Sequence, residues 1–297
     1  MNEPSCSVVI PVRDRRRDVQ QAVASVLSQT FSDFEVVVVD DGSTDGSGEA
    51  ALESGDPRLR LVRLPGSGVS VARNAGVAQA KAPWVAFLDS DDVWLPRFLE
   101  RTLELARAHP NTGLIFSNCL SVRDRRPWLD LPYAGPTLVE DYLEFLIRNE
   151  GRGLQTSTTV VHRDTLRAVG GFPPGVARSE DTDTWLRLAL RGPVGCVPEV
   201  LAEFHNEAVG KTRAIPQPCY PEPVNTLRRL RAQGSLDEGR SRQALRLESL
   251  YLLIYARDLL DYGDASRARE ILRREVDWRR SPPLSLSKAV VRAALGR

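Results

Sequence analysis

The stretch Phe87-Leu88-Asp89-Ser90-Asp91-Asp92 places three carboxylates directly after a short apolar run. The run, residues 84–88, has the length and composition of a buried β-strand. Carboxylates this close together repel one another unless positive charge lies among them, and a hard divalent cation with oxygen ligands is the usual partner. The alternative is that these acidic residues cap a following helix. The neighbouring segments of the sequence have to decide between the two.

Strand and helix patterns alternate on both sides of this stretch. Residues 7–12, 34–39, 59–64, 84–88 and 113–118 have the pattern of strands. Residues 16–29, a segment ending at Ser54, residues 69–80 and a segment that begins at Pro96 have the pattern of helices. This alternation predicts an α/β fold, in which helices cover both faces of a mostly parallel, Rossmann-like sheet.

The alternation weakens after Asn118. The segment 123–136 is expected to be a loop or hairpin, followed by helices at 139–149 and 181–191 and strands at 158–162 and 200–205. Beyond a proline-rich stretch, residues 225–233, 240–262 and 265–277 are predicted to be helices. The sequence therefore predicts a C-terminal helical segment after the α/β part.

The composition indicates a globular protein. The 297 residues are 42% hydrophobic and 27% charged, with a net charge of +1, so that the global charge predicts no nucleic-acid partner. No apolar run is long enough to span a bilayer, and the first residues do not resemble a signal peptide. Four cysteines without metal-type spacing are expected to be reduced. We therefore expect a cytoplasmic protein.

Three polar segments follow predicted strands, where open parallel sheets bind ligands. Asp40 and Asp41 end the second strand, Asp89-Ser90-Asp91 ends the fourth, and Gly66-Ser67-Gly68 ends the third just before a helix. A helix N-terminus favours a phosphate, and a metal on Asp91 would bridge phosphates from the other side. These features together predict a site for a nucleoside diphosphate compound, with Asp40 available to hydrogen-bond a base.

Other phosphate and metal motifs fit less well. Residues 66–71 begin like a dinucleotide fingerprint, but Val71 stands where Gly or Ala belongs, and the segment follows the third strand instead of the first. Residues 89–100 resemble a calcium loop, but Trp94 stands where glycine is required. The chain also lacks a G-x-x-x-x-G-K-S/T phosphate loop and a G-x-S-x-G nucleophile turn.

Five blocks of sequence carry a specific resemblance. They are Val8-Val9-Ile10-Pro11-Val12, residues 37–45 (Val-Val-Val-Asp-Asp-Gly-Ser-Thr-Asp), Val71-Ala72-Arg73-Asn74-Ala75-Gly76, Phe87-Leu88-Asp89-Ser90-Asp91-Asp92, and Val169-Gly170-Gly171-Phe172 with Ser179-Glu180-Asp181-Thr182-Asp183 and Trp185-Leu186-Arg187. In order and spacing they resemble glycosyltransferase family 2, whose members have the GT-A fold. The resemblance covers residues 7–205 and leaves the helical remainder outside.

The resemblance implies where a nucleotide sugar would bind. By analogy with the family, Pro11, Val12 and Arg13 border the nucleobase, and Asp40 accepts its imide N–H. Arg73 lies near the base and the phosphates. The implied domains are residues 1–213, made of a nucleotide-sugar half (1–118) and an acceptor half (119–213), and a C-terminal helical region (214–297).

The resemblance also implies the reacting groups. Asp89, with Ser90 beside it, reaches the ribose of the nucleotide sugar, and Asp91 binds a divalent metal, Mn²⁺ or Mg²⁺. His205 lies where the family places a histidine near the metal and the diphosphate. Asp181 is the general base that deprotonates the acceptor hydroxyl. The implied reaction inverts the anomeric centre and moves a sugar from a UDP-sugar to a glycan or lipid-linked acceptor in cell-surface polysaccharide or glycoconjugate assembly.

Several alternatives stay open at this point. Asp181 could instead be the N-cap of the helix that follows it, although the neighbouring charges of Glu180 and Asp183 favour the base, and Asp183 is a rival base. Arg13-Asp14 replaces an aromatic-Asn pair that is frequent in the family. Glu203-Phe204 precedes His205, where the family often has an arginine, and Lys211 or Arg213 could supply the missing charge. A nucleotidyltransferase that makes nucleotide sugars, and an inactive protein that binds them, are the alternative functions.

The end of the chain is basic. From residue 265 on, nine basic residues stand against three acidic ones, a net charge of +6. One interpretation is peripheral contact with an anionic membrane surface, where lipid-linked acceptors are found. The other is a solvated helical cap on the catalytic domain.

Overall fold

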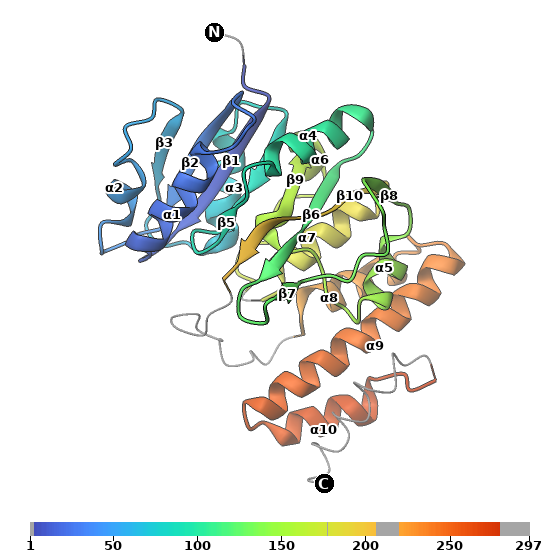
Figure 1. Cartoon of the computed structure of the whole chain (residues 1–297). Helices are drawn as coiled ribbons and strands as arrows, with labels where there is room; N and C mark the ends of the chain where they lie inside the picture. Colours follow the sequence, from blue (N-terminus) through green and yellow to red (C-terminus); the bar gives the residue numbers. More distant parts are fainter. Residues whose placement is uncertain (1–2, 177, 206–219, 280–297) are drawn as a thin grey trace. The chain divides into compact units, whose positions relative to one another are not determined.

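The structure is a computed structural model that describes residues 3–176, 178–205 and 220–279 (Figure 1). The chain divides into two compact units, each assembled from separate segments of the sequence. The first unit takes residues 1–140, 154–175 and 187–208. The second takes residues 141–153, 176–186 and 209–297. Lys211 and Arg213, the candidates for a missing phosphate contact, lie outside the described residues.

The first unit is built on a ten-stranded sheet, counted over the described residues. The strands are β1 (Cys6–Val12), β2 (Phe34–Asp40), β3 (Leu59–Arg63), β4 (Trp84–Phe87), β5 (Val93–Trp94), β6 (Leu114–Ser121), β7 (Arg126–Pro127), β8 (Thr137–Val139), β9 (Thr159–His162) and β10 (Val194–Phe204). The order is β3-β2-β1-β4-β9-β6-β10-β5, with β7 beside β6 and β8 beside β10. The α/β fold with a central sheet is confirmed.

The direction of the strands follows the prediction in the first half of the sheet. The strands β1 to β4 are parallel, because a helix joins each of them to the next along the chain. β9 runs antiparallel to both β4 and β6, and β5 runs antiparallel to β10, so that the sheet is mixed. A strand's own residues do not encode its direction, and β9 is entered through a short 3-10 turn, Thr156–Thr158, instead of a crossover helix.

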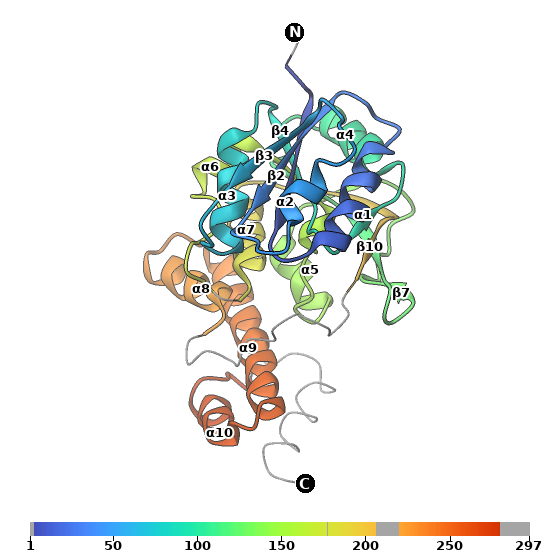
Figure 2. The same ribbon diagram turned by 90° about the vertical axis from the view of Figure 1, so that its left-hand side faces the viewer.

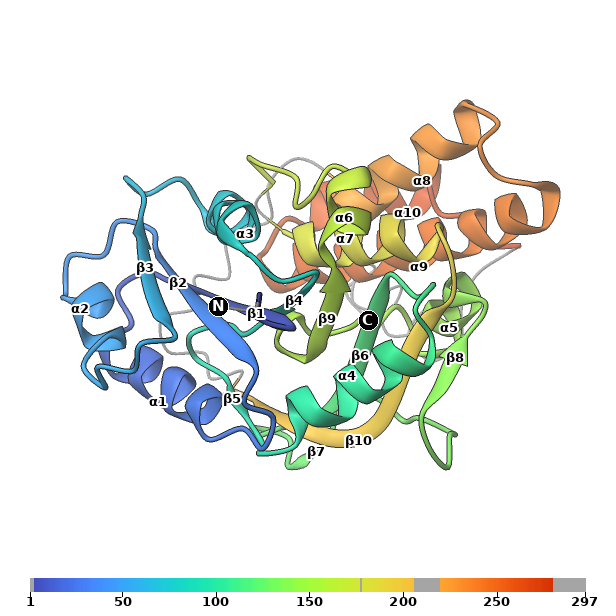
Figure 3. The same cartoon turned by 90° about the horizontal axis from the view of Figure 1, so that it is seen from above.

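Helices cover both faces of this sheet, as predicted. They are α1 (Arg16–Leu27), α2 (Ser47–Ala51), α3 (Val69–Gln79), α4 (Phe98–Ala108) and α6 (Arg163–Ala168). Seen from above, α1 and α4 lie on one face and α3 and α6 on the other (Figure 3). α2 packs beside α1 (Figures 2 and 3). The sequence did not predict α6, because six residues are too few for a clear helical period.

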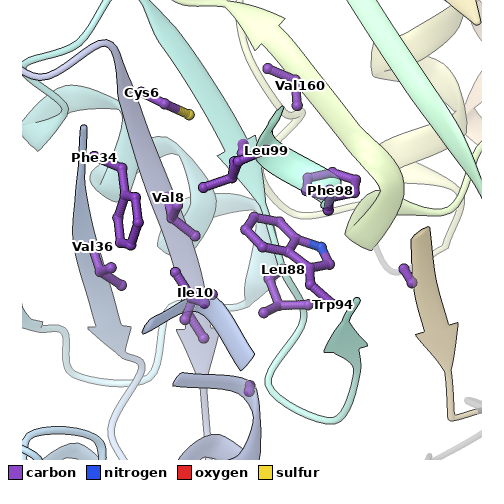
Figure 4. Close-up of a cluster of buried hydrophobic side chains, with 14 of the residues drawn as sticks. Cys6, Val8, Ile10, Phe34, Val36, Leu88, Trp94, Phe98, Leu99 and Val160 are labelled. Carbon is purple, nitrogen blue, oxygen red and sulfur yellow. The ribbon is translucent and has the colours of Figure 1, made fainter. Parts of the chain in front are cut away.

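Alternate residues of β1 face the two helical layers. Val8 and Ile10 point into the core under α1 and α4, where Trp94, Phe98 and Leu99 pack (Figure 4). On the opposite face, α3 lies so close to the sheet that a Cβ built on Gly76 would be 2.4 Å from Cγ1 of Val9 and 3.3 Å from Cγ2 of Val39. Every residue of β2, Glu35 and Asp40 included, is buried, as in a strand that is covered on both faces of the sheet.

The second unit is helical. It contains α5 (Tyr142–Arg148), α8 (Glu222–Ala232), α9 (Glu238–Asp261), α10 (Ala265–Arg274) and the N-terminal part of α7 (Glu180–Ala189). The 24-residue helix α9 packs against α5, α8 and α10. Glu248 of α9 accepts hydrogen bonds from Arg228 and Arg231 of α8, both at 2.6 Å. None of the helices that the structure describes has the length and apolar character that a membrane span requires.

Candidate functional site

The residues predicted for donor and metal binding all belong to the first unit. They are Pro11, Val12, Arg13, Asp40, Arg73, Asp89, Ser90, Asp91 and His205. Most of them lie at or just after the carboxyl ends of β1, β2, β4 and β10, and Arg73 lies on α3. Asp181, the predicted base, belongs to the second unit and lies in the first turn of α7.

Arg73 and Asp89, which lie in different sequence blocks, form an ion pair. The Nη2 atom of Arg73 donates to Oδ1 of Asp89 at 2.8 Å. Arg73 is only 4% exposed, and its guanidinium lies 5.3 Å from the ring centroid of Phe172. Because α3 is pressed against β1 and β2, the arginine reaches the end of β4 from a rigid position. The sequence therefore identified two residues that the fold brings together.

Asp91 faces a second arginine. The Nη2 atom of Arg15, in the turn after β1, lies 3.9 Å from Oδ2 of Asp91. Asp91 is partly exposed, whereas the neighbouring Ser90 and Asp92 are buried. Of the three carboxylates of the run, Asp92 is buried, and the side chains of Asp91 and Asp89 are 17% and 31% exposed.

Asp92 is the buried member of the carboxylate run and was not assigned a role from the sequence. Burial, followed by the charges of Asp89 and Asp91, raises the pKa of Asp92 to about 7. Its Oδ2 atom accepts from the hydroxyl of Ser157 at 2.5 Å, and its Oδ1 atom accepts from the backbone N–H of His205 at 2.9 Å. The end of β4 is therefore tied to the end of β10.

The donor set can be compared with the needs of a divalent cation. Among the residues that the structure describes, no three His, Cys, Asp or Glu side chains gather as they would around an ion. Asp89 and Asp92 already accept hydrogen bonds from Arg73, Ser157 and His205. Mg²⁺ in phosphate-binding sites is commonly held by one or two carboxylates together with substrate phosphates. The crowded negative charge and the partly exposed Asp91 fit an ion that is held by one or two carboxylates together with the phosphates of a substrate. They do not fit an ion that is held by protein ligands alone.

The loops after β1 and β2 are joined to each other. Pro11 pairs with Val39 and Val12 pairs with Asp40 in the sheet. Asp40 is buried, and its Oδ1 atom accepts from the backbone N–H of Ser43 at 2.8 Å. Asp14, in the loop after β1, accepts from the backbone N–H of Thr44, in the loop after β2, at 2.7 Å. This is how the fold fixes the loops that the family resemblance assigns to the nucleobase.

The glycine turn after β3 corrects one prediction. The carboxylate of Asp41 accepts from the backbone N–H groups of Ser67 and Gly68, at 2.6 Å and 2.8 Å. The expectation that this turn faces a phosphate is wrong for these two groups, because an internal anion already satisfies them. Asp41 therefore holds the turn that leads into α3. Arg13 lies over this turn, since a Cβ on Gly66 would be 3.5 Å from its Nη1 atom.

The acidic start of α7 contains the two candidate bases. Oδ1 of Asp181 accepts from the backbone N–H of Thr182 at 2.6 Å, and Asp181 is partly exposed. Asp183 is 1% exposed. Burial, followed by the charges of Asp181 and Asp183, raises the pKa of Tyr251 on α9. Of the two aspartates, Asp181 is the one that solvent, and therefore a ligand, can reach.

Two further residues hold the site and were not predicted to do so. The side-chain amide of Asn74 accepts from the backbone N–H of Phe172 at 2.9 Å and donates to its carbonyl at 2.7 Å. Arg187 donates to the carbonyl of Gly171 at 2.8 Å. The bonds of Asn74 join the third and fifth sequence blocks, and the bond of Arg187 joins two parts of the fifth, so the available signal was that these segments occur together.

The chain was compared with known proteins. A sequence model described as Glycosyl transferase family 2 matches residues 7–161. The putative teichuronic acid biosynthesis glycosyltransferase TuaG of Bacillus subtilis is 31% identical over 207 residues, which are 68% of this chain and 79% of TuaG. An uncharacterised glycosyltransferase of Rickettsia conorii is 28% identical over 210 residues, 68% of this chain. The chain spans 33% of the length of that protein, and the same share of a relative from Rickettsia felis.

Solved structures share the fold. The structure of S. aureus TarS 1-349 in complex with UDP-GlcNAc has a TM-score of 0.66 at 17% identity, covering 93% of this chain and 89% of TarS 1-349. The mannosyltransferase PcManGT of Pyrobaculum calidifontis, in complex with GDP-Man and Mn²⁺, has a TM-score of 0.60 at 16% identity. That comparison covers 99% of this chain and 87% of PcManGT. The architecture is thus that of the GT-A fold.

Proposed function

This chain belongs to glycosyltransferase family 2, and we propose that it is a metal-dependent, inverting enzyme that moves a sugar from a UDP-sugar to an acceptor hydroxyl. The observation that carries this proposal is the carboxylate run after β4, where Asp89 pairs with Arg73, Asp92 is buried against Ser157 and the backbone of His205, and Asp91 is partly exposed and faces Arg15. A helix cap would not require this arrangement.

Donor binding is assigned to residues of the first unit. Asp91 would hold a Mn²⁺ or Mg²⁺ ion, with His205 as a further candidate, and the ion would supply Lewis-acid stabilisation of the departing diphosphate. Arg73 and Asp89 lie as an ion pair beside it, and their roles at the phosphates and the ribose follow the family resemblance. Mn²⁺ in the PcManGT complex supports the metal, and UDP-GlcNAc in the TarS complex supports a UDP-sugar.

Proton transfer is assigned to Asp181. An acceptor hydroxyl is a poor nucleophile, and a carboxylate within hydrogen-bond reach takes its proton as the new bond forms. Attack on the face of the sugar opposite the diphosphate then inverts the anomeric centre and needs no protein nucleophile. The burial of Asp183 supports Asp181 over its rival.

The biological role is proposed from the relatives. TuaG is named as a putative enzyme of teichuronic acid biosynthesis, which supports a role in cell-surface polysaccharide or glycoconjugate assembly. The acceptor would be a glycan or a lipid-linked glycan. The division into a donor half, an acceptor half and a C-terminal helical region, as expected from the sequence, is part of the same proposal.

The C-terminal region is proposed to touch the membrane from the cytoplasmic side. Trp278 is 43% exposed, and its indole N–H donates to the carbonyl of Leu272 at the end of α10, at 2.9 Å. Exposed arginines surround it in the sequence: Arg269, Arg273, Arg274 and Arg279. An amphipathic indole beside basic residues suits the interface of an anionic bilayer. Residues 285–295, expected to form a short helix, lie outside the described residues.

Sedimentation with phosphatidylglycerol vesicles tests this contact. Trp278→Ala combined with Arg273→Glu should lower vesicle binding, whereas Arg242→Glu, at an exposed arginine near the start of α9, should leave it unchanged. Equal binding of all three proteins would contradict the membrane proposal and leave a solvated helical cap.

A donor screen tests the enzymatic proposal. The protein would be heated with a panel of nucleotide sugars, with and without Mn²⁺, and the donors that stabilise it would be assayed for release of the nucleoside diphosphate. We expect stabilisation and turnover with a UDP-sugar only when the metal is present. Stabilisation and turnover with a guanosine diphosphate sugar instead would change the assigned nucleobase from uracil to guanine. Release of pyrophosphate from a nucleoside triphosphate would favour a nucleotidyltransferase. Failure of every donor would refute the proposal.

A further inference from the structure

One residue, Ser157 in the 3-10 turn before β9, bonds to two members of the carboxylate run at once. Its hydroxyl donates to Oδ2 of Asp92 at 2.5 Å and accepts from the backbone N–H of Asp89 at 3.0 Å. A serine hydroxyl has one proton to donate and lone pairs to accept, so one side chain can serve both partners at once. Ser157 therefore fixes the residues on either side of the Ser90-Asp91 pair.

The backbone of Ser157 is fixed in turn. Its carbonyl accepts from the indole N–H of Trp94 at 2.6 Å, and Trp94 stacks on Phe98 with ring centroids 4.1 Å apart. Ser157 and Trp94 are 1% and 2% exposed. A residue this deeply buried can act on a ligand only through other residues.

Asp92 extends the connection to β10. Its Oδ1 atom accepts from the backbone N–H of His205 at 2.9 Å, while Oδ2 is occupied by Ser157. The bonds thus run from Ser157 through Asp92 to the backbone of His205, and separately from Ser157 to the backbone of Asp89. Two residues are assigned to the metal. His205 belongs to this network through its backbone N–H, and Asp91 is next to Asp92 in the sequence.

We infer that Ser157 and Asp92 are positioning residues that set the geometry of Asp91 and His205 for a divalent cation, an inference that rests on the proposed function. Neither side chain needs to touch the ion. Removing a group that orients a metal's ligands lowers metal affinity or activity about tenfold to a hundredfold.

The test measures Mn²⁺ directly, by calorimetry and by the paramagnetic resonance signal of free Mn²⁺, on full-length protein with UDP present. Ser157→Ala is expected to weaken Mn²⁺ binding about tenfold or more, while the affinity for UDP measured without metal stays close to that of the wild type. A purely structural loss would lower stability and leave the Mn²⁺ constant unchanged.

Ser7→Ala is the matched control. Ser7 is a buried serine of the same unit whose hydroxyl donates to Oε1 of Glu35 at 2.7 Å and accepts from the backbone N–H of Ala82 at 3.1 Å. The substitution removes two buried hydrogen bonds around β1, and neither involves the carboxylate run, Ser157 or Trp94. We expect it to lower the melting temperature without changing the Mn²⁺ constant.

The outcomes separate the two proposals. If the wild type binds no Mn²⁺ with any nucleotide, the proposed function fails. If the wild type binds Mn²⁺ and Ser157→Ala binds it equally well, only the positioning role is overturned. Should Ser157→Ala not fold, Asp92→Asn decides in the same assay: a raised Mn²⁺ constant supports the inference, and an unchanged constant overturns it.

Discussion

Two acidic segments of this protein are held in different ways. The carboxylates at residues 89–92 accept hydrogen bonds from groups far away in the sequence, on Arg73, Ser157 and His205. At the start of α7, Asp181 accepts from the backbone of the very next residue, Thr182. The first segment is thus placed by the assembled sheet, whereas this bond of the second can form as soon as the local turn forms. We expect changes in the first to alter ligand binding and changes in the second to alter turnover.

The largest effect is expected at Asp91. Asp91→Asn removes the carboxylate assigned to the metal, so metal-dependent nucleotide binding and activity should fall together. A Lewis-acid contribution of several kcal/mol corresponds to a loss of about a thousandfold or more in rate. Calorimetry with Mn²⁺ and UDP, alongside initial rates, measures both. Unchanged Mn²⁺-dependent binding in this variant would show that the metal is held elsewhere. It would contradict the assignment of ligand binding to the carboxylates at residues 89–92.

Asp181→Asn should separate binding from turnover. The amide cannot accept the acceptor's proton, so kcat should fall by about a hundredfold to a thousandfold. Donor affinity, measured by calorimetry, should stay within a factor of about two because Asp181 is not assigned to the donor. Near-normal rates would move the base to Asp183, and Asp183→Asn is then the decisive second variant.

The packing of α3 against β1 and β2, which places Arg73, can be disturbed without changing a carboxylate. Gly76→Val forces α3 away from β1, because even a Cβ would meet Val9 at 2.4 Å. Overpacking of this kind costs about 1–3 kcal/mol of stability, and the shift should also weaken donor binding by moving Arg73. Gly192→Ala, where a Cβ would meet nothing within 4 Å, is the control. Chemical denaturation gives the free energy of unfolding. Loss of stability without loss of donor binding would show that Arg73 is placed independently of α3 packing.

The smallest effect concerns pH. Burial by itself would raise the pKa of Glu35, but hydrogen bonds from Ser7, from the backbone of Lys81 and from Arg60 outweigh it, so that the pKa is lowered. A lowered carboxyl pKa contributes stability above its ordinary value near 4.5, and that stability is lost as the pH falls through the value in the folded state.

Glu35→Gln should therefore flatten the dependence of the melting temperature on pH below about 5. The variant would be compared with the wild type from neutral to acidic pH. An unchanged slope would mean that other carboxylates, such as those of residues 89–92, govern acid unfolding of the first unit.

The contrast between the two acidic segments also explains what could be predicted. The strands of the parallel half, the helices on both faces and the carboxylates after β4 follow from local patterns, and the pairing of Arg73 with Asp89 agrees with their assignment to one site. The expectation that a phosphate meets the N–H groups of Ser67 and Gly68 was wrong, because the carboxylate of Asp41 accepts from both. Nothing near Ser157 in the sequence marks it as a partner of Asp89 and Asp92, which lie 68 and 65 residues away.

The sequence by itself determined the parallel half of the sheet and the presence of carboxylates where β4 ends, because apolar periodicity and turn chemistry are properties of neighbouring residues. Only the tertiary structure decided the antiparallel course of β9, and only it brought Arg73, Ser157 and His205 to those carboxylates. Hydrogen-bond partners depend on which strands lie side by side, and strand order is set by the packing of the whole core.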